Sequence, residues 1–81
     1  MKLSKQIKVS IDFYNDRLLY EVRRRLNAAI DYIEQENFLA ASKELGEALL
    51  DHATFHGGDD LNTVLADFYK ASLDLNDGVN N

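Results

Sequence analysis

The sequence predicts an all-α protein, a small three-helix bundle built on a central antiparallel helical hairpin. Apolar residues recur at three- and four-residue intervals through most of the chain, which places them on one face of each helix. The chain contains no proline, which suits long uninterrupted helices. We expect one domain with helices over about residues 4–36, 37–56 and 60–76 and a frayed tail over 77–81.

The central hairpin spans Leu26 to Leu50 and turns at Gln35, Glu36 and Asn37. Its first arm has one apolar face, and its second arm repeats the same spacing. Asn37 is a good N-cap, and so short a link makes the two arms antiparallel neighbours. Small side chains let the two helix axes approach closely, and they are Ala29, Ala41 and Ala48.

This hairpin resembles a single tetratricopeptide repeat in the spacing of its small, aromatic and packing positions, which are Ala29, Tyr32, Phe38, Ala41, Leu45 and Ala48. It departs from that family at Arg25, where the family prefers a large aromatic residue, and at Ala53, where it prefers proline. No second copy follows, and solenoids need about three repeats to bury a continuous core. We therefore interpret the likeness as convergent packing of a helical hairpin.

Residues 4–14 fit two patterns. Their apolar and polar residues alternate as in a half-buried strand, but they also begin a stripe of nearly helical spacing that runs from Ile7 to Ile33. A lone strand needs a partner, and nothing else in the sequence has a strand pattern. We therefore expect a long N-terminal helix, with a cap or kink near Asn15-Asp16 where it could be broken.

As a strand, this segment resembles the start of the ribbon-helix-helix DNA-binding proteins, in which two chains pair their strands. The resemblance implies that Lys8, Ser10 and Asp12 face the major groove of DNA. Asp12 is unfavourable there, and phosphate would repel the acidic second half of the chain. Direct binding to nucleic acid is therefore the less favoured expectation.

The second arm of the hairpin is expected to stop at Gly57-Gly58, where glycine adopts a left-handed cap. Asp59 or Asp60 then caps the last helix, which ends near Asn76. Eight aromatic residues are too many for so small a core. The core is expected to include Tyr14 and Tyr32, and the surface to include Phe13, Tyr20 and Tyr69, which fall off the main apolar stripes. Exposed aromatic residues are typical of protein interfaces.

Charge is divided unevenly along the chain. Residues 1–33 carry seven basic and four acidic side chains, a net +3, whereas residues 34–81 carry two basic and ten acidic ones, a net −8. The simplest interpretation is that the basic helix lies beside the acidic ones. An acidic surface can also steer toward a basic partner. The acidic residues expected to bind such a partner are Glu44, Glu47, Asp51, Asp59, Asp60, Asp67 and Asp74.

The function expected from these features is to bind, and to inhibit or modulate, a larger protein with a basic surface. Phage-encoded inhibitors of nucleic-acid-binding host proteins, such as anti-CRISPR proteins, are similar in size, acidity and missing chemistry, an analogy of type rather than a sequence match. The alternative is a nucleic-acid-associated regulator that uses the basic residues Lys5, Lys8, Arg17, Arg23, Arg24 and Arg25.

A homodimer through the N-terminal helix is also expected. An unbroken helix over residues 4–36 would be about 50 Å long, and residues 37–75 could not cover all of it unless they stacked end to end along it. An apolar stripe from Ile7 to Leu18 would then remain open for a second chain.

Catalysis and cofactors are not expected. The chain has no cysteine, which excludes disulfides and thiolate zinc sites and fits the cytoplasm, and it has no glycine-rich phosphate loop. His52 and His56 share a helix face near several acids and are the candidate metal ligands, but a helix C-terminus also favours histidine without a metal. No apolar run reaches the roughly 18 residues of a membrane span, and residues 1–10 lack the apolar core of a signal peptide.

Overall fold

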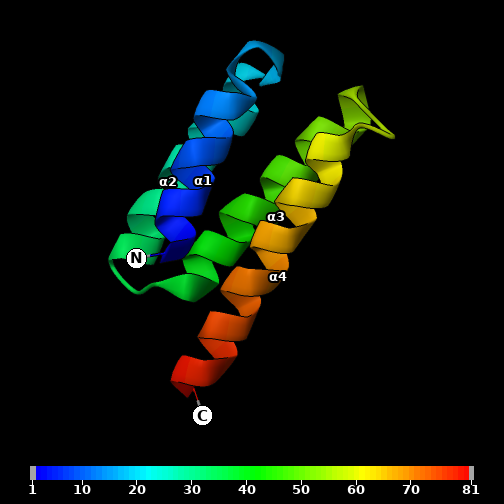
Figure 1. Cartoon of the computed structure of the whole chain (residues 1–81). Coiled ribbons are helices and arrows are strands. Elements are labelled where there is room, and N and C mark those ends of the chain that lie inside the picture. Colours follow the sequence, from blue (N-terminus) through cyan, green and yellow to red (C-terminus); the bar gives the residue numbers. More distant parts are fainter. Residues whose placement is uncertain (1, 81) are drawn as a thin grey trace.

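The structure is a computed structural model that describes residues 2–80. These residues form an all-helical fold in which consecutive long helices run in alternate directions (Figure 1). The elements in chain order are α1 (Lys2–Phe13), the short 3₁₀ turn η1 (Asn15–Arg17), α2 (Tyr20–Glu34), α3 (Phe38–Phe55) and α4 (Asp60–Asn80). The all-α prediction is confirmed for the described residues. The strand interpretation of residues 4–14 is wrong, because these residues lie mainly in α1.

The prediction of three helices is wrong, because the expected long N-terminal helix is two helices. The break between α1 and α2 includes Asn15 and Asp16, where a break was expected. The described residues span only 36 Å in their longest dimension. An unbroken helix over residues 4–36 would be about 50 Å long and would extend far beyond the core. Folding α1 back onto α2 buries Ile7 and Ile11 instead. The apolar stripe that was expected to attract a second chain is therefore covered from within the same chain.

Polar contacts hold the connection between α1 and α2 in place. Arg17 in η1 donates hydrogen bonds to the carboxylates of Asp59 and Asp60, the latter at 2.6 Å, and its guanidinium lies 5.0 Å from the centre of the Tyr14 ring. Arg23 in α2 donates to the backbone carbonyl of Asn15 at 2.9 Å. The Arg17 hydrogen bonds attach the break to the turn between α3 and α4, which is distant in the sequence, and the Arg23 hydrogen bond attaches it to α2.

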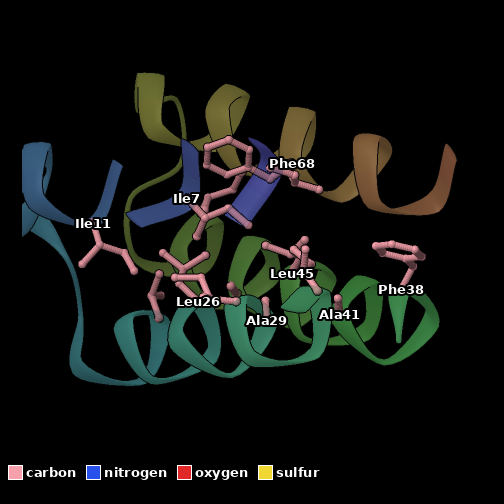
Figure 2. Packing of buried hydrophobic residues seen from close by; sticks show 14 of the residues in the cluster. Ile7, Ile11, Leu26, Ala29, Phe38, Ala41, Leu45 and Phe68 are labelled. Atoms are coloured by element: carbon pink, nitrogen blue, oxygen red, sulfur yellow. The ribbon is translucent and has the colours of Figure 1, made fainter. Parts of the chain in front are cut away.

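The predicted central hairpin is confirmed as the α2–α3 pair. Ala29 of α2 and Ala41 and Ala48 of α3 have no solvent exposure, as expected of small residues at a close helix contact. Leu45 is also fully buried, and side chains from all four helices join one apolar cluster around it (Figure 2). The hairpin thus forms the base on which α1 and α4 are packed.

The turn between α2 and α3 is closed by backbone hydrogen bonds. The Asn37 N–H donates to the Tyr32 carbonyl at 2.8 Å, and the Glu36 N–H donates to the Ile33 carbonyl at 2.9 Å, which is the Schellman arrangement at a helix end. The Asn37 side chain accepts a hydrogen bond from the Ala40 N–H at 3.3 Å, so the predicted N-cap is confirmed. Glu36 has a φ of 59°, in the left-handed region that normally takes glycine.

We predict that Glu36→Gly stabilises the protein. The substitution removes a steric penalty of about 1 kcal/mol, part of which is offset by the greater freedom of glycine in the unfolded chain, leaving a gain of about 0.5 kcal/mol. Urea unfolding followed by circular dichroism measures this difference. Gln35→Gly, at the neighbouring position with φ of −87°, is the control and should destabilise. Equal losses in both variants would contradict the assignment of strain to Glu36.

The C-terminal half follows the predicted order with one correction. The α3 helix ends at Phe55, and Gly58 has the left-handed φ of 85° expected after a helix end. The Asp59 carboxylate accepts a hydrogen bond from the Leu61 N–H at 3.2 Å, so Asp59 supplies the cap of α4. The α4 helix continues to residue 80 rather than ending near residue 76, because Gly78 costs only about 1 kcal/mol within a helix. Asn81, the end of the expected frayed tail, lies outside the described residues.

We predict that Leu45→Asp unfolds the protein. The substitution places an unpaired charge at a site with no solvent exposure, at a cost of about 4 kcal/mol or more, which is most of the stability of a small domain. Glu44→Gln, one residue away on the half-exposed side of α3, is the control and should remain folded. Far-UV circular dichroism and thermal unfolding of both variants test this. A cooperative, helical Leu45→Asp variant would show that the core position is misassigned.

Candidate interaction surfaces

Four of the seven acidic residues expected to bind a partner are paired within the chain. Arg25 of α2 lies 3.8 Å from Glu44 and 3.1 Å from Asp51, both on α3. Asp59 and Asp60 are held by Arg17. The structure therefore does not present the predicted acidic residues as one continuous surface. The three that are exposed and form no ion pair within residues 2–80 are Glu47, Asp67 and Asp74.

The predicted basic residues are also largely engaged. Besides the pairs of Arg17 and Arg25, Arg24 donates to Glu21 at 2.8 Å, and Arg23 binds a backbone carbonyl. Lys5 and Lys8 of α1 remain exposed. The interpretation that basic N-terminal residues lie beside acidic C-terminal ones thus holds for Arg17 and Arg25, each of which joins two parts of the fold.

The two histidines lie at the C-terminal end of α3 in different environments. His52 is fully buried, with Nε2 3.3 Å from an Asp59 carboxylate oxygen, whereas His56 is exposed and its ring centre lies 4.9 Å from that of His52. Across residues 2–80, no group of three or more histidine, cysteine or acidic side chains is arranged to hold a metal ion. The contact between His52 and Asp59 instead joins the end of α3 to the start of α4.

Asp59 is the centre of this polar cluster. A hydrogen bond with the Asp60 carboxyl, the Leu61 N–H, His52 and the Arg17 guanidinium together hold the pKa of Asp59 well below its usual range. The ionised form is therefore favoured in the folded protein relative to the unfolded chain. By linkage, this contribution to stability is complete above the unfolded pKa near 3.8 and is lost as the pH falls below it.

We predict that Asp59→Asn lowers the melting temperature at pH 7 and that the difference from the wild type shrinks below about pH 4. The asparagine keeps the size of the side chain but loses the charge that pairs with Arg17. Thermal unfolding between pH 7 and pH 3 measures the effect. Asp74→Asn is the control, because Asp74 is exposed and unpaired among the described residues. A difference that grows on acidification would contradict the assigned role of the Asp59 carboxylate.

Ser42 and Ser72 form hydrogen bonds in the interior of the fold. The Ser42 hydroxyl donates to the Phe38 carbonyl at 2.8 Å and lies 2.9 Å from the Ser72 hydroxyl, which lies 3.0 Å from the same carbonyl. Both serines are buried. These hydrogen bonds link α3 to α4 and satisfy polar groups that burial would otherwise leave unpaired.

A groove lies between α1 and α4. Leu3, Phe68 and Ala71 line a space of 690 Å³ that also contacts Lys2 and Lys5 of α1 and Asp67 of α4. An adjoining space of 440 Å³ continues along the helices past Asp74 and Leu75. The groove exists because α1 packs mainly on α2, and α4 mainly on α3, so that α1 and α4 contact each other only sparsely. It combines apolar side chains with exposed carboxylates.

A second groove of 470 Å³ lies on the outer side of α3 and α4. It is lined by Leu39 and Leu50, whose exposed fractions are 51% and 65%. The Tyr69 ring lies across Gly46, where an added Cβ would be only 3.2 Å from a ring carbon. Tyr69 was expected at the surface, but its ring is half-buried against α3, so this prediction is only partly confirmed.

Other aromatic side chains are exposed at the C-terminal end of α3, at the start of α2 and at the end of α1. Tyr20 and Phe55 line one small pocket and are 76% and 71% exposed. Phe13 is 79% exposed and contacts the Tyr14 ring edge-to-face at 4.8 Å. The predicted exposure of Phe13 and Tyr20 is confirmed.

The exposure of Leu39 and Leu50 at the surface was not predicted from the sequence. The available signal was the composition of α3, which has apolar residues around most of its circumference and little amphipathic asymmetry. The exposure of Phe55 was not predicted, because it results from the end of α3 at this residue, just before Gly57-Gly58.

Comparison of the chain with protein-family models, with curated protein sequences and with solved structures finds no match. Among the described helices, none combines the length and the apolar composition needed to cross a membrane.

Proposed function

We propose that this protein is a non-catalytic helical binding protein that occupies a surface of a larger protein and thereby inhibits or modulates it. The observation that carries the proposal is the α1–α4 groove, in which an apolar floor lies beside two exposed carboxylates. Protein interfaces combine an apolar centre with a charged rim in this way. Asp67 and Asp74 are the members of the predicted acidic set that line this groove.

The chemistry of the groove indicates the kind of partner. Leu3, Phe68 and Leu75 offer apolar contacts, so a matching segment carries apolar side chains toward the floor. Asp67 and Asp74 lie seven residues apart on α4, which places them on the same side of the helix about 10 Å apart. Basic side chains at similar spacing on the partner would pair with them. The net charge of −5 favours encounter with such a basic surface.

An inhibitor of a nucleic-acid-binding host protein, as in the phage-encoded anti-CRISPR class, is the specific form of this proposal. Carboxylates presented by a small helical protein can occupy positions that phosphates would take on a basic surface. The size and acidity of the chain support this form. The proposed partner is therefore a basic nucleic-acid-binding surface rather than a nucleic acid itself.

A function in direct nucleic-acid binding has less support from the side-chain contacts. Arg17, Arg24 and Arg25 are paired with carboxylates of the same chain, so their charges are partly neutralised. The α1–α4 groove is lined by the exposed Lys2 and Lys5 as well as by Asp67 and Asp74. A phosphate backbone in this groove would meet both signs of charge.

We predict that Asp67→Lys together with Asp74→Lys weakens binding to the partner at least about tenfold, because each substitution sets like charges against each other. The tagged protein would be cross-linked in an extract of its source cells, and the cross-linked partner identified by mass spectrometry and then purified. Titration calorimetry with the wild type and the variant measures the affinity. The matched control is Asp31→Lys with Glu36→Lys, which carries the same charge change on exposed positions outside the groove.

Two outcomes would contradict the proposal. One is equal loss of binding in the groove variant and the control, which would indicate only the effect of net charge. The other is a salt-dependent mobility shift of generic DNA or RNA that is abolished by Lys5→Gln with Lys8→Gln. That result would favour the nucleic-acid-associated function instead. Circular dichroism confirms that each variant remains folded.

A further inference from the structure

The outer face of α3 has apolar residues that the fold does not cover. This helix lies between α2 and α4, and its inward residues are fully buried, including Leu45 and Ala48. Leu39 and Leu50 on the outer side are more than half exposed. A helix that is apolar around most of its circumference normally requires burial on most of its circumference. Contacts within this chain supply only part of that burial.

The residues on this face follow a symmetrical order along the helix. Leu39 and Leu50 stand at the two ends, about 16 Å apart at the helical rise. Between them lie Lys43 and Glu47, exposed and of opposite charge, with Gly46 beside them. In either direction along the helix, this face presents a leucine, two residues of opposite charge and a second leucine. Such a surface is complementary to a copy of itself in the antiparallel direction.

We propose that this outer face, defined by Leu39, Lys43, Gly46, Glu47 and Leu50, is the interface of an antiparallel homodimer. In a two-fold dimer each residue i that contacts residue j of the second copy is matched by the reciprocal contact. Leu39 then meets Leu50 of the second copy, and Lys43 meets Glu47, with each pair formed twice. The occupant of the groove is therefore a second copy of this chain.

Charge selects the antiparallel arrangement over the parallel one. A parallel pairing of two α3 helices would set Lys43 against Lys43 and Glu47 against Glu47, which is unfavourable. The antiparallel pairing replaces both repulsions with two attractions. Gly46 and the Tyr69 ring that covers it add a smooth apolar surface near the centre.

This interface is separate from the groove proposed to bind the larger protein. On α4, Leu73 and Tyr69 line the outer α3–α4 groove, whereas Asp67 and Asp74 line the α1–α4 groove. Nor does the dimer use the N-terminal stripe that the sequence suggested, because Ile7 and Ile11 are buried within the chain. Each dimer would therefore present two α1–α4 grooves to its partners.

The test is a charge exchange across the proposed two-fold axis. Analytical ultracentrifugation from about 10 μM to about 1 mM should show a wild-type monomer–dimer equilibrium, in the range usual for a small interface. Lys43→Glu alone and Glu47→Lys alone should each raise the dimer dissociation constant at least about tenfold, because each places two like-charged pairs in the interface. The double variant should restore the wild-type value to within about threefold, because the pairs are again opposite in charge.

A second pair of variants tests the apolar contacts. Leu50→Ser should raise the dissociation constant, whereas Val9→Ser, a comparably exposed apolar residue on α1, should leave it unchanged. Circular dichroism verifies folding throughout. A wild-type protein that is monomeric over the whole range would overturn the proposal, and so would a dimer unaffected by Leu50→Ser. Failure of the double charge variant to recover dimerisation would overturn the antiparallel arrangement. None of these outcomes depends on Asp67 or Asp74, so they are distinct from the test of partner binding.

Discussion

The close packing of α2 on α3 is the contact on which the rest of the fold depends. It is made possible by the fully buried Ala29, Ala41 and Ala48, because their small side chains let the two helices approach closely. The remaining helices are each attached to this pair, α1 on α2 and α4 on α3, and they contact each other only sparsely. The α1–α4 groove follows from that arrangement. Its floor is formed by Leu3 and Phe68, which are nearly buried, and by the half-buried Ala71 and Leu75.

Arginine side chains provide the second set of contacts that determine the shape of the molecule. Arg25 bridges α2 and α3, and Arg17 attaches the break after α1 to the turn before α4. Partly exposed ion pairs contribute little stability individually, so their main effect is to specify which segments lie together. The same pairs reduce the acidic and basic charge available to outside partners. The exposed charges that form no ion pair among residues 2–80 include Lys5 and Lys8 on α1 and Asp67 and Asp74 on α4.

The proposed functions follow from surfaces that the fold leaves uncovered. Four short helices have more apolar surface than one small core can bury, and part of the excess lies on the outer face of α3, where Leu39 and Leu50 are more than half exposed. The two surfaces differ in their charge pattern. The α1–α4 groove has carboxylates along α4, which suit basic side chains of a partner, and lysines along α1, whereas on the α3 face one charge of each sign lies on a single helix in a self-complementary order. This difference is why they are assigned to different occupants.

Local patterns in the sequence determined the helices and the turn at Gln35–Asn37, because helical spacing, an N-cap and small residues at a contact are set by nearby residues. They also determined the place where the N-terminal helix breaks. Only the tertiary structure decided that the break occurs, because this depended on how much apolar surface of α1 the hairpin could cover. It also decided which acids are free, since the pairing of Arg17 with Asp59 and Asp60 joins residues more than forty positions apart. Charge composition could not reveal this, because an ion pair depends on distance in space and not on position in the chain.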